Sequence, residues 1–310
     1  MNRPTYLRVV ATTRCNHRCD FCHMEGDPHE AGTPSELPAD ALVACLRAAA
    51  LAGVKKFKFL GGEPLLRNDL PQVIASLRGL APDADISVIT AGAVPVSRLV
   101  AAYEAGLTRV NMSIHGWSPE ALAVNLKQRD GHARREAFLA RACLEAAARE
   151  VPLKLNYVYS GAHQRDDLGG LLAWAATQPR VVVSVLDDLA SLLRWRDIAD
   201  VVTALRGPHC DEQLALDPDS LATLRRRWSD GLTVELKHQE LGRVAPFDAC
   251  ADCDHRAACR EGIMALRLTH RGTLQGCLHR EDLGFALSDY VAANGASLGA
   301  VLLRNLVEAW

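Results

Sequence analysis

Short apolar segments rich in β-branched residues alternate along the chain with longer segments of helical periodicity. The apolar segments span residues 6–12, 55–60, 85–90, 108–114, 152–158 and 180–186, and the helical ones span about 38–52, 69–79, 95–105, 132–149, 165–177 and 189–205. Apolar runs of this length are typical of buried strands, and apolar residues three or four apart are typical of amphipathic helices. The pattern therefore predicts six strand–helix units around a parallel sheet, an α/β fold whose functional face lies at the carboxyl ends of the strands.

The pattern changes after residue 237. There a polar, cysteine-rich segment precedes a short strand-like stretch at residues 265–269, a turn at Arg271-Gly272 and a helical tail that ends at Trp310. We therefore expect two regions, a main domain at 1–237 and a smaller appendage at 238–310.

The composition is that of a globular chain without a strong global charge. Hydrophobic residues make up 49% and charged residues 23%, and 35 Lys and Arg against 37 Asp and Glu give a formal charge of −2. A balanced charge recruits neither a nucleic-acid polymer nor an anionic membrane. Because the sequence has no apolar run of about 18 residues and no signal-peptide core at its start, we expect a cytoplasmic protein without a transmembrane helix.

Ten cysteines are the unusual feature of the composition. In an intracellular chain, closely spaced cysteines are metal ligands or catalytic groups more often than disulfides. Cys15, Cys19 and Cys22 are spaced C-x3-C-x2-C directly after the first predicted strand. Three thiolates this close can hold one iron–sulfur cluster and leave its fourth iron without a protein ligand. A structural zinc loop completed by His23 is the alternative.

These cysteines and a second motif together resemble the radical S-adenosylmethionine (radical SAM) superfamily. Phe21 stands just before the last cysteine, and Gly61-Gly62-Glu63-Pro64 ends the second predicted strand. The resemblance implies a partial (β/α)6 TIM-type barrel in which the three cysteines hold a [4Fe–4S] cluster whose open iron binds S-adenosylmethionine. It also implies that the glycine-rich segment contacts the methionine amino group, where two glycines allow close backbone approach and Glu63 offers a carboxylate. Alone, this segment would indicate a tight turn before a helix.

The resemblance narrows to the MoaA-type GTP 3′,8-cyclases over most of the chain, from YLRVVATTRCNHRC through KKFKFLGGEPLLRNDL to LKLNYVYSGAHQRDD. It implies that Thr90 and Ser113 line the S-adenosylmethionine pocket. It further implies a set of substrate-contacting residues in the barrel mouth, which are Arg8, Arg67, Lys154, Asn156 and Arg267. Arginines suit the bidentate recognition of phosphate. For each basic residue the alternative is a solvated surface charge.

The C-terminal appendage carries four cysteines, Cys250, Cys253, Cys259 and Cys277, spaced C-x2-C-x5-C-x17-C. The stretch LRLTHRGTLQGCL resembles the second-cluster segment of the cyclases, which implies a small iron–sulfur cluster-binding appendage with an auxiliary [4Fe–4S] cluster. The sequence departs from the cyclases at Ala265, which replaces an arginine, in the fourth cysteine, and in an ending without Gly-Gly. Four cysteines could saturate this cluster. A histidine ligand, either His255, His270 or His279, and a zinc knuckle are the alternatives.

The resemblance implies an enzyme that reductively cleaves S-adenosylmethionine to a 5′-deoxyadenosyl radical, which abstracts hydrogen from a substrate. We expect a small phosphorylated or nucleotide-like substrate that undergoes cyclisation, rearrangement or epimerisation, a reaction other than GTP 3′,8-cyclisation, and an electron donor such as flavodoxin or ferredoxin. Modification of a ribosomally made peptide in natural-product biosynthesis is the alternative, and a non-catalytic iron–sulfur or zinc protein is a third hypothesis. Cys45 and Cys143 are expected to be buried thiols, and Cys210 is assigned no role.

Overall fold

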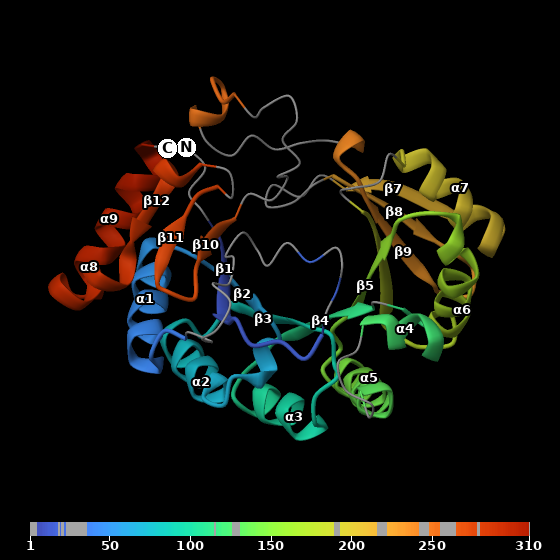
Figure 1. The fold of residues 1–310 in the computed structure, drawn as a ribbon, viewed down its shortest axis with the longest axis horizontal. Helices are drawn as coiled ribbons and strands as arrows, with labels where there is room; N and C mark the ends of the chain where they lie inside the picture. The colour runs from blue at the N-terminus through green and yellow to red at the C-terminus, as the bar shows by residue number, and fades with distance from the viewer. Residues whose placement is uncertain are drawn as a thin grey trace.

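One bent sheet organises the chain. The computed structural model describes residues 5–17, 19, 22, 36–114, 116–125, 131–188, 193–215, 222–241, 248–254, 265–277 and 280–309. Within these ranges twelve strands form a single sheet in the order β12-β11-β10-β1-β2-β3-β4-β5-β6-β9-β8-β7. The sheet curves into an open horseshoe with most of the helices on its convex side (Figure 1). The barrel is therefore partial, because its two edge strands do not pair with each other.

The six central strands are parallel and consecutive, as the alternating pattern predicts. They are β1 Tyr6–Thr12, β2 Lys56–Gly61, β3 Asp85–Thr90, β4 Arg109–Ile114, β5 Leu153–Tyr159 and β6 Val181–Asp187. Every boundary lies within one residue of its predicted position. Their carboxyl ends meet at one rim of the horseshoe, where the loop with the first three cysteines follows β1.

The helices that connect these strands are α1 Ala39–Ala52, α2 Leu70–Leu80, α3 Val96–Glu104, α4 Pro119–Asn125, α5 Gly131–Ala148, α6 Arg165–Ala175 and α7 Trp195–Arg206. The short α4 was not predicted. The last helix was predicted to begin at residue 189. That prediction was wrong at residues 193 and 194, which are not helical, because α7 begins at Trp195. Asp197 explains that start, because its carboxylate accepts the Arg194 backbone N–H at 2.8 Å and caps the first turn. None of the described helices has both the length and the apolar character that crossing a membrane requires.

Two faces of each central strand have different chemistry. On β2, Phe57 and Phe59 are fully buried and pack into the core beneath the helices, whereas Lys58 between them points to the opposite, concave face. Burying one such side chain contributes roughly 2–3 kcal/mol, so the convex face holds the sheet to its helices. The concave face is left for polar side chains.

Shorter elements extend the sheet at both edges. On one side β9 Thr233–Lys237 pairs parallel with β6, and β8 Thr223–Arg227 and β7 Asp211–Ala215 follow antiparallel. On the other side β10 Leu266–Leu268 pairs parallel with β1, as expected for the strand-like stretch, and β11 Thr273–Gln275 and β12 Gly284–Ala286 follow antiparallel. The remaining helices α8 Leu287–Asn294 and α9 Ala296–Ala309 pack against α1. The residues after 237 thus continue the sheet beside β1.

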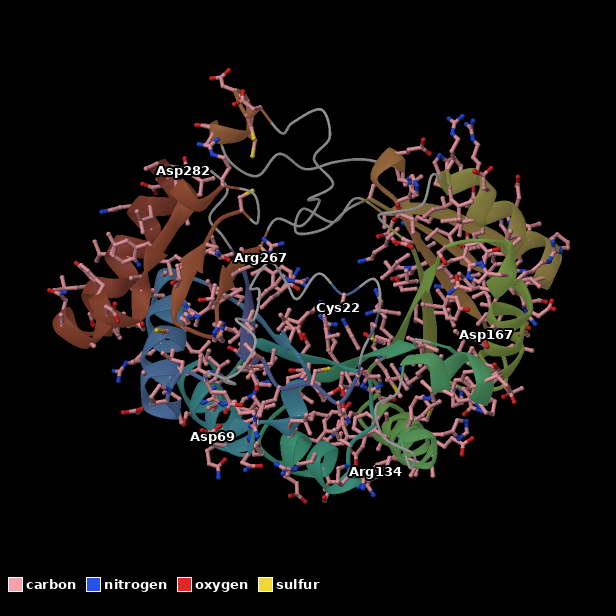
Figure 2. All side chains as sticks on the ribbon, in the orientation of Figure 1. Cys22, Asp69, Arg134, Asp167, Arg267 and Asp282 are labelled. Carbon is pink, nitrogen blue, oxygen red and sulfur yellow. The ribbon has the colours of Figure 1, made fainter. Side chains whose placement is uncertain are left out.

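Asp167 on α6 joins three parts of the barrel wall (Figure 2). Its carboxylate accepts the backbone N–H groups of Trp117 and Ser118, both at 2.7 Å, and the hydroxyl of Tyr157 at 2.9 Å. We predict that Asp167→Ala lowers the free energy of unfolding by about 3 kcal/mol, and Tyr157→Phe by about 1 kcal/mol, because the first leaves donors without an ionised acceptor. Chemical denaturation measures both. Asp166→Ala, an exposed neighbour, is the control; an equal loss there would contradict this role.

Candidate active site

The cysteine loop is anchored at the carboxyl end of β1. Cys15 and Cys19 are partly buried and Cys22 is exposed, and none of the three forms a disulfide. The Asn16 side chain donates to the Ala93 carbonyl at 2.7 Å and so fixes the loop to the segment after β3. Cys22 donates its backbone N–H to the Cys19 carbonyl at 3.1 Å. Figure 2 shows Cys22 on the concave side of the sheet, whereas Asp69 and Arg134 lie toward its outer side.

The glycine-rich segment at the end of β2 is docked onto the backbone of the cysteine loop. Gly62 donates its N–H to the Thr12 carbonyl at 2.9 Å, and Glu63 donates its N–H to the Arg14 carbonyl at 2.7 Å. A Cβ on Gly62 would lie 2.2 Å from the Arg14 carbonyl oxygen, and Gly61 has a φ of +130°. Only glycine fits this approach. The two motifs therefore lie side by side, and three thiols outside any disulfide, in a loop anchored at Asn16, are a donor set suited to an iron–sulfur cluster.

Glu63 ties the end of β2 to the end of β3. Its buried carboxylate accepts the Thr90 hydroxyl at 2.8 Å, the Ala91 N–H at 2.9 Å and the Leu65 N–H at 3.2 Å. Burial raises the pKa of Glu63 to about 7, against these hydrogen bonds, which favour the charged form. Glu63 and Thr90 thus hold the rim together. Contact of Glu63, Pro64 and Thr90 with a ligand stays a prediction, and Phe21 lies outside the described residues.

A row of basic residues crosses the concave face of the sheet. Arg267 on β10, Arg8 on β1, Lys58 on β2 and Arg109 on β4 are joined through adjacent register positions, with Ser87 on β3 completing the row. Neighbouring positions in register point to the same face, so these four cations form what we call the cationic row. Burial first, and then the charges of Arg8, Arg109 and Lys154, lower the pKa of Lys58 to about 7.

Across the barrel, the predicted residues Lys154, Asn156 and Ser113 share this concave face. Asn111 on β4 pairs in register with Lys154, and Ser113 pairs with Asn156. The ammonium of Lys154 donates a short hydrogen bond to Glu235 on β9. Glu235 also accepts Arg225 on β8 at 2.7 Å. The structure therefore gathers Arg8, Lys154, Asn156 and Arg267 on one surface.

Arg67 lies apart from that surface. It is 2% exposed, and its guanidinium donates to the Ala11 carbonyl at 2.9 Å, to the Leu37 carbonyl at 2.8 Å and to the Asp69 carboxylate at 2.6 and 3.2 Å. Four of the five N–H groups of an arginine are thereby used. A direct contact with substrate, as predicted, would require some of these bonds to break. Here Arg67 connects the end of β1 to the start of α1.

The second group of cysteines lies on two segments of the chain. Cys250 lies in the short 3-10 helix Asp248–Cys250, Cys253 follows it, and Cys277 follows β11. Arg280 links the segments by donating to the Ala249 carbonyl at 3.2 Å. Hydrogen bonds to Asp282, and secondarily to Cys253, hold the pKa of Arg280 above its usual range. Cys259, His255 and His279 lie outside the described residues. Within the described ranges no three Cys, His, Asp or Glu side chains are arranged to hold a metal ion.

The isolated cysteines follow expectation in part. Cys45 is 1% exposed within the core, and burial raises its pKa to about 12. Cys143 is only partly buried, with a pKa raised by burial to about 11, and Cys210 is exposed. A buried, protonated thiol is a poor ligand or nucleophile.

The sequence prediction missed Lys58, Arg109 and Glu235. Each stands in a strand where polar residues alternate with buried apolar ones, as in Lys56-Phe57-Lys58-Phe59. A central parallel strand covered by helices on one face shows such alternation only if its other face is polar. This alternation was the available signal for a polar barrel interior.

Comparisons with known proteins agree with this architecture. The family model described as Radical SAM superfamily matches residues 9–175. A probable GTP 3′,8-cyclase of Methanocella arvoryzae is 33% identical over 98% of this chain and 90% of its own length, and a GTP 3′,8-cyclase of Campylobacter curvus is 28% identical over 97% and 88%. The crystal structure of Streptococcus suis SuiB bound to S-adenosylmethionine has a TM-score of 0.58 at 14% identity, over 88% of this chain and 60% of that one. SuiB bound to precursor peptide SuiA matches with a TM-score of 0.58 at 13% identity, over 98% and 70%.

Glu63 gives the rim a pH dependence of known sign. Because burial raises its pKa to about 7, the unfolded chain loses this proton at lower pH than the folded protein does. The contribution of Glu63 to the free energy of unfolding is therefore complete below the ordinary carboxyl pKa. It falls by on the order of 3 kcal/mol as the pH rises toward 7.

Denaturation of wild type and Glu63→Gln at several pH values between 4.5 and 7.5 checks this prediction. The neutral variant is expected to lose this component of the pH dependence, whereas the exposed control Glu104→Gln is expected to follow wild type. Equal slopes for wild type and Glu63→Gln would show that this carboxylate titrates as an exposed one does.

Proposed function

The chain belongs to the radical SAM superfamily, and we propose that Cys15, Cys19 and Cys22 hold the [4Fe–4S] cluster of a radical SAM enzyme acting on a small phosphorylated or nucleotide-like substrate. The observation that carries the proposal is the contact between the cysteine loop and the Gly61-Gly62 backbone, on the same concave side as the cationic row. It supports a cofactor-binding rim that lies next to a surface suited to an anion.

When bound, the cluster supplies the electron that cleaves S-adenosylmethionine to methionine and a 5′-deoxyadenosyl radical, which abstracts hydrogen from the substrate. The residues of this chain bind and orient the reactants. Gly61 and Gly62 leave their backbone open to close approach, and Glu63 fixes that backbone against β3. Thr90 and Ser113 border the proposed S-adenosylmethionine pocket. The curved sheet surrounds the reactants and limits access of water to the radical.

The cationic row supports an anionic substrate. Arg8 and Arg267 are 7% and 2% exposed and stand next to each other in register on the concave face. Phosphate satisfies arginine through bidentate hydrogen bonds, and Asn156 adds a neutral polar contact on the same face. The proposed chemistry is cyclisation, rearrangement or epimerisation. Ala265 and the fourth cysteine are departures from the cyclases that argue against GTP 3′,8-cyclisation.

We further propose an auxiliary [4Fe–4S] cluster on Cys250, Cys253, Cys259 and Cys277, and a functional division of the chain at residue 237. The contact of Arg280 with Ala249 supports this proposal, because it joins the two segments that carry these cysteines. Four thiolate ligands would leave no iron open to substrate, so this cluster would adjust the local potential or pass an electron. An external donor such as flavodoxin or ferredoxin would supply the reducing electron.

The cofactor assignment is tested by replacing cysteines. After anaerobic reconstitution we expect about eight irons per chain if both clusters are [4Fe–4S], and about four if the C-terminal site holds zinc. Changing Cys15, Cys19 and Cys22 to Ala should remove about four irons and abolish the release of 5′-deoxyadenosine from S-adenosylmethionine with dithionite. Iron analysis and chromatography measure the two effects.

The exposed Cys210→Ala is the matched control and is expected to retain both iron and cleavage. Cys259→Ala is expected to leave slow cleavage of S-adenosylmethionine that is uncoupled from substrate. Full iron content in the triple variant would rule out the assigned ligands, and wild-type behaviour of Cys259→Ala in every assay would remove that residue from the auxiliary set.

Substitutions of Arg8 and Arg67 are expected to affect different properties, substrate binding for Arg8 and stability for Arg67. Arg8→Ala should weaken the binding of nucleoside phosphates by about 10- to 100-fold, because charge-assisted hydrogen bonds are lost. Arg67→Ala should instead lower the free energy of unfolding by about 3–5 kcal/mol, because the buried guanidinium links Ala11, Leu37 and Asp69.

Calorimetric binding of nucleotides and of short peptides, together with thermal denaturation, measures both effects. Unchanged nucleotide affinity in Arg8→Ala would refute the phosphate surface. Binding of peptides but not of nucleotides by wild type would favour peptide modification instead.

A further inference from the structure

Glu235 places a negative charge among the cations of the barrel interior. It lies in the middle of β9, its side chain is 5% exposed, and one carboxylate oxygen accepts Arg225 at 2.7 and 3.2 Å while the other accepts Lys154. Burial alone would raise the pKa of Glu235, but Lys154 and Arg225 outweigh it and hold the pKa below its usual range. The carboxylate is therefore ionised at neutral pH.

This carboxylate lines a cavity of about 430 Å³ at the amino-terminal ends of the central strands. Arg109, Lys154, Arg225 and Arg227 line it as well. Arg109 is bound to Asp85 at 2.6 Å, so these four cations are balanced by two carboxylates and keep a net charge of +2. The cavity adjoins the cationic row, because Arg109 belongs to the row and also lines the cavity.

Glu235 also reduces the number of cations that can bind a ligand. Lys154 and Arg225 already donate hydrogen bonds to its carboxylate oxygens. A polyphosphate chain that runs toward β5 would bring its added phosphates close to the Glu235 carboxylate. In a half-buried site such like-charge contacts are much stronger than in water.

We propose that Glu235 is a specificity-determining residue that limits the charge of the substrate, because its carboxylate weighs against each phosphate added to a phosphate monoester. This inference rests on the proposed phosphorylated substrate and adds to it the number of phosphates. Glu235 acts by excluding charge and takes no part in the chemistry.

The test compares three probes, GMP, GDP and GTP, by anaerobic calorimetry on the reconstituted full chain. Wild type is expected to gain less affinity from the second and third phosphates than Glu235→Gln does. Glu235→Gln keeps the shape of the side chain but removes its charge, and should tighten GTP binding at least tenfold relative to GMP. Glu212→Gln is the matched control, because Glu212 binds Arg226 on the outer face of the same hairpin at 2.7 Å. Its preference should equal that of wild type.

A second variant, expected to shift the nucleotide preference in the opposite direction, tests the proposal even if Glu235→Gln folds poorly. Arg225→Gln, at a side chain that is 40% exposed, deletes a cation but leaves Glu235, and should weaken GTP binding more than GMP binding. Preferences that stay the same in both variants would overturn the inference while leaving the proposed function intact. No binding of any of the three nucleotides to wild type would overturn the proposed substrate class and this inference together.

Discussion

The contact between Gly62 and the backbone of the cysteine loop is the constraint on which the proposed site depends. A side chain on Gly62 would collide with the Arg14 carbonyl, so the two motifs can touch only through bare backbone. Other bonds hold this contact in place: Glu63 fastens the end of β2 to β3, Asn16 fastens the loop beyond β3, and Arg67 fastens the end of β1 to α1. Each of these bonds involves backbone at the carboxyl rim, so that rim is rigid where the cofactor is proposed to bind.

The second constraint is the polar concave face of the sheet. An α/β barrel normally fills its interior with branched apolar side chains. Here the interior carries the cationic row on one side and the Lys154–Glu235–Arg225 group on the other. The formal charge of −2 over the whole chain conceals this distribution. Burying cations costs free energy, which the apolar core on the convex face must offset.

The sequence predicted the central strands to within a residue because each is a short segment rich in apolar residues that a longer helical segment follows, and it predicted the family from two local motifs. It did not predict β8, since Thr223–Arg227 contains three arginines and resembles no buried strand. That strand exists because Leu224 and the register with β9 hold it in the sheet. Nor could local sequence show that Arg67 bonds to Ala11 and Leu37, or that Glu235 reaches Lys154 some eighty residues away. Such contacts depend on strand register, which only the folded sheet defines.

Register also connects the two cysteine regions. Arg267 pairs with Arg8 on one side and with Gln275 on the other, and Cys277 follows Gln275 by two residues. A cluster on Cys277 would therefore be held by the same strands that present the cationic row. A shift of β11 by one residue would move Arg267 out of its pairing and turn the side chains of β11 to the opposite face. The C-terminal region thus forms part of the barrel wall, and one sheet sets the positions of Cys277 and of the cationic row.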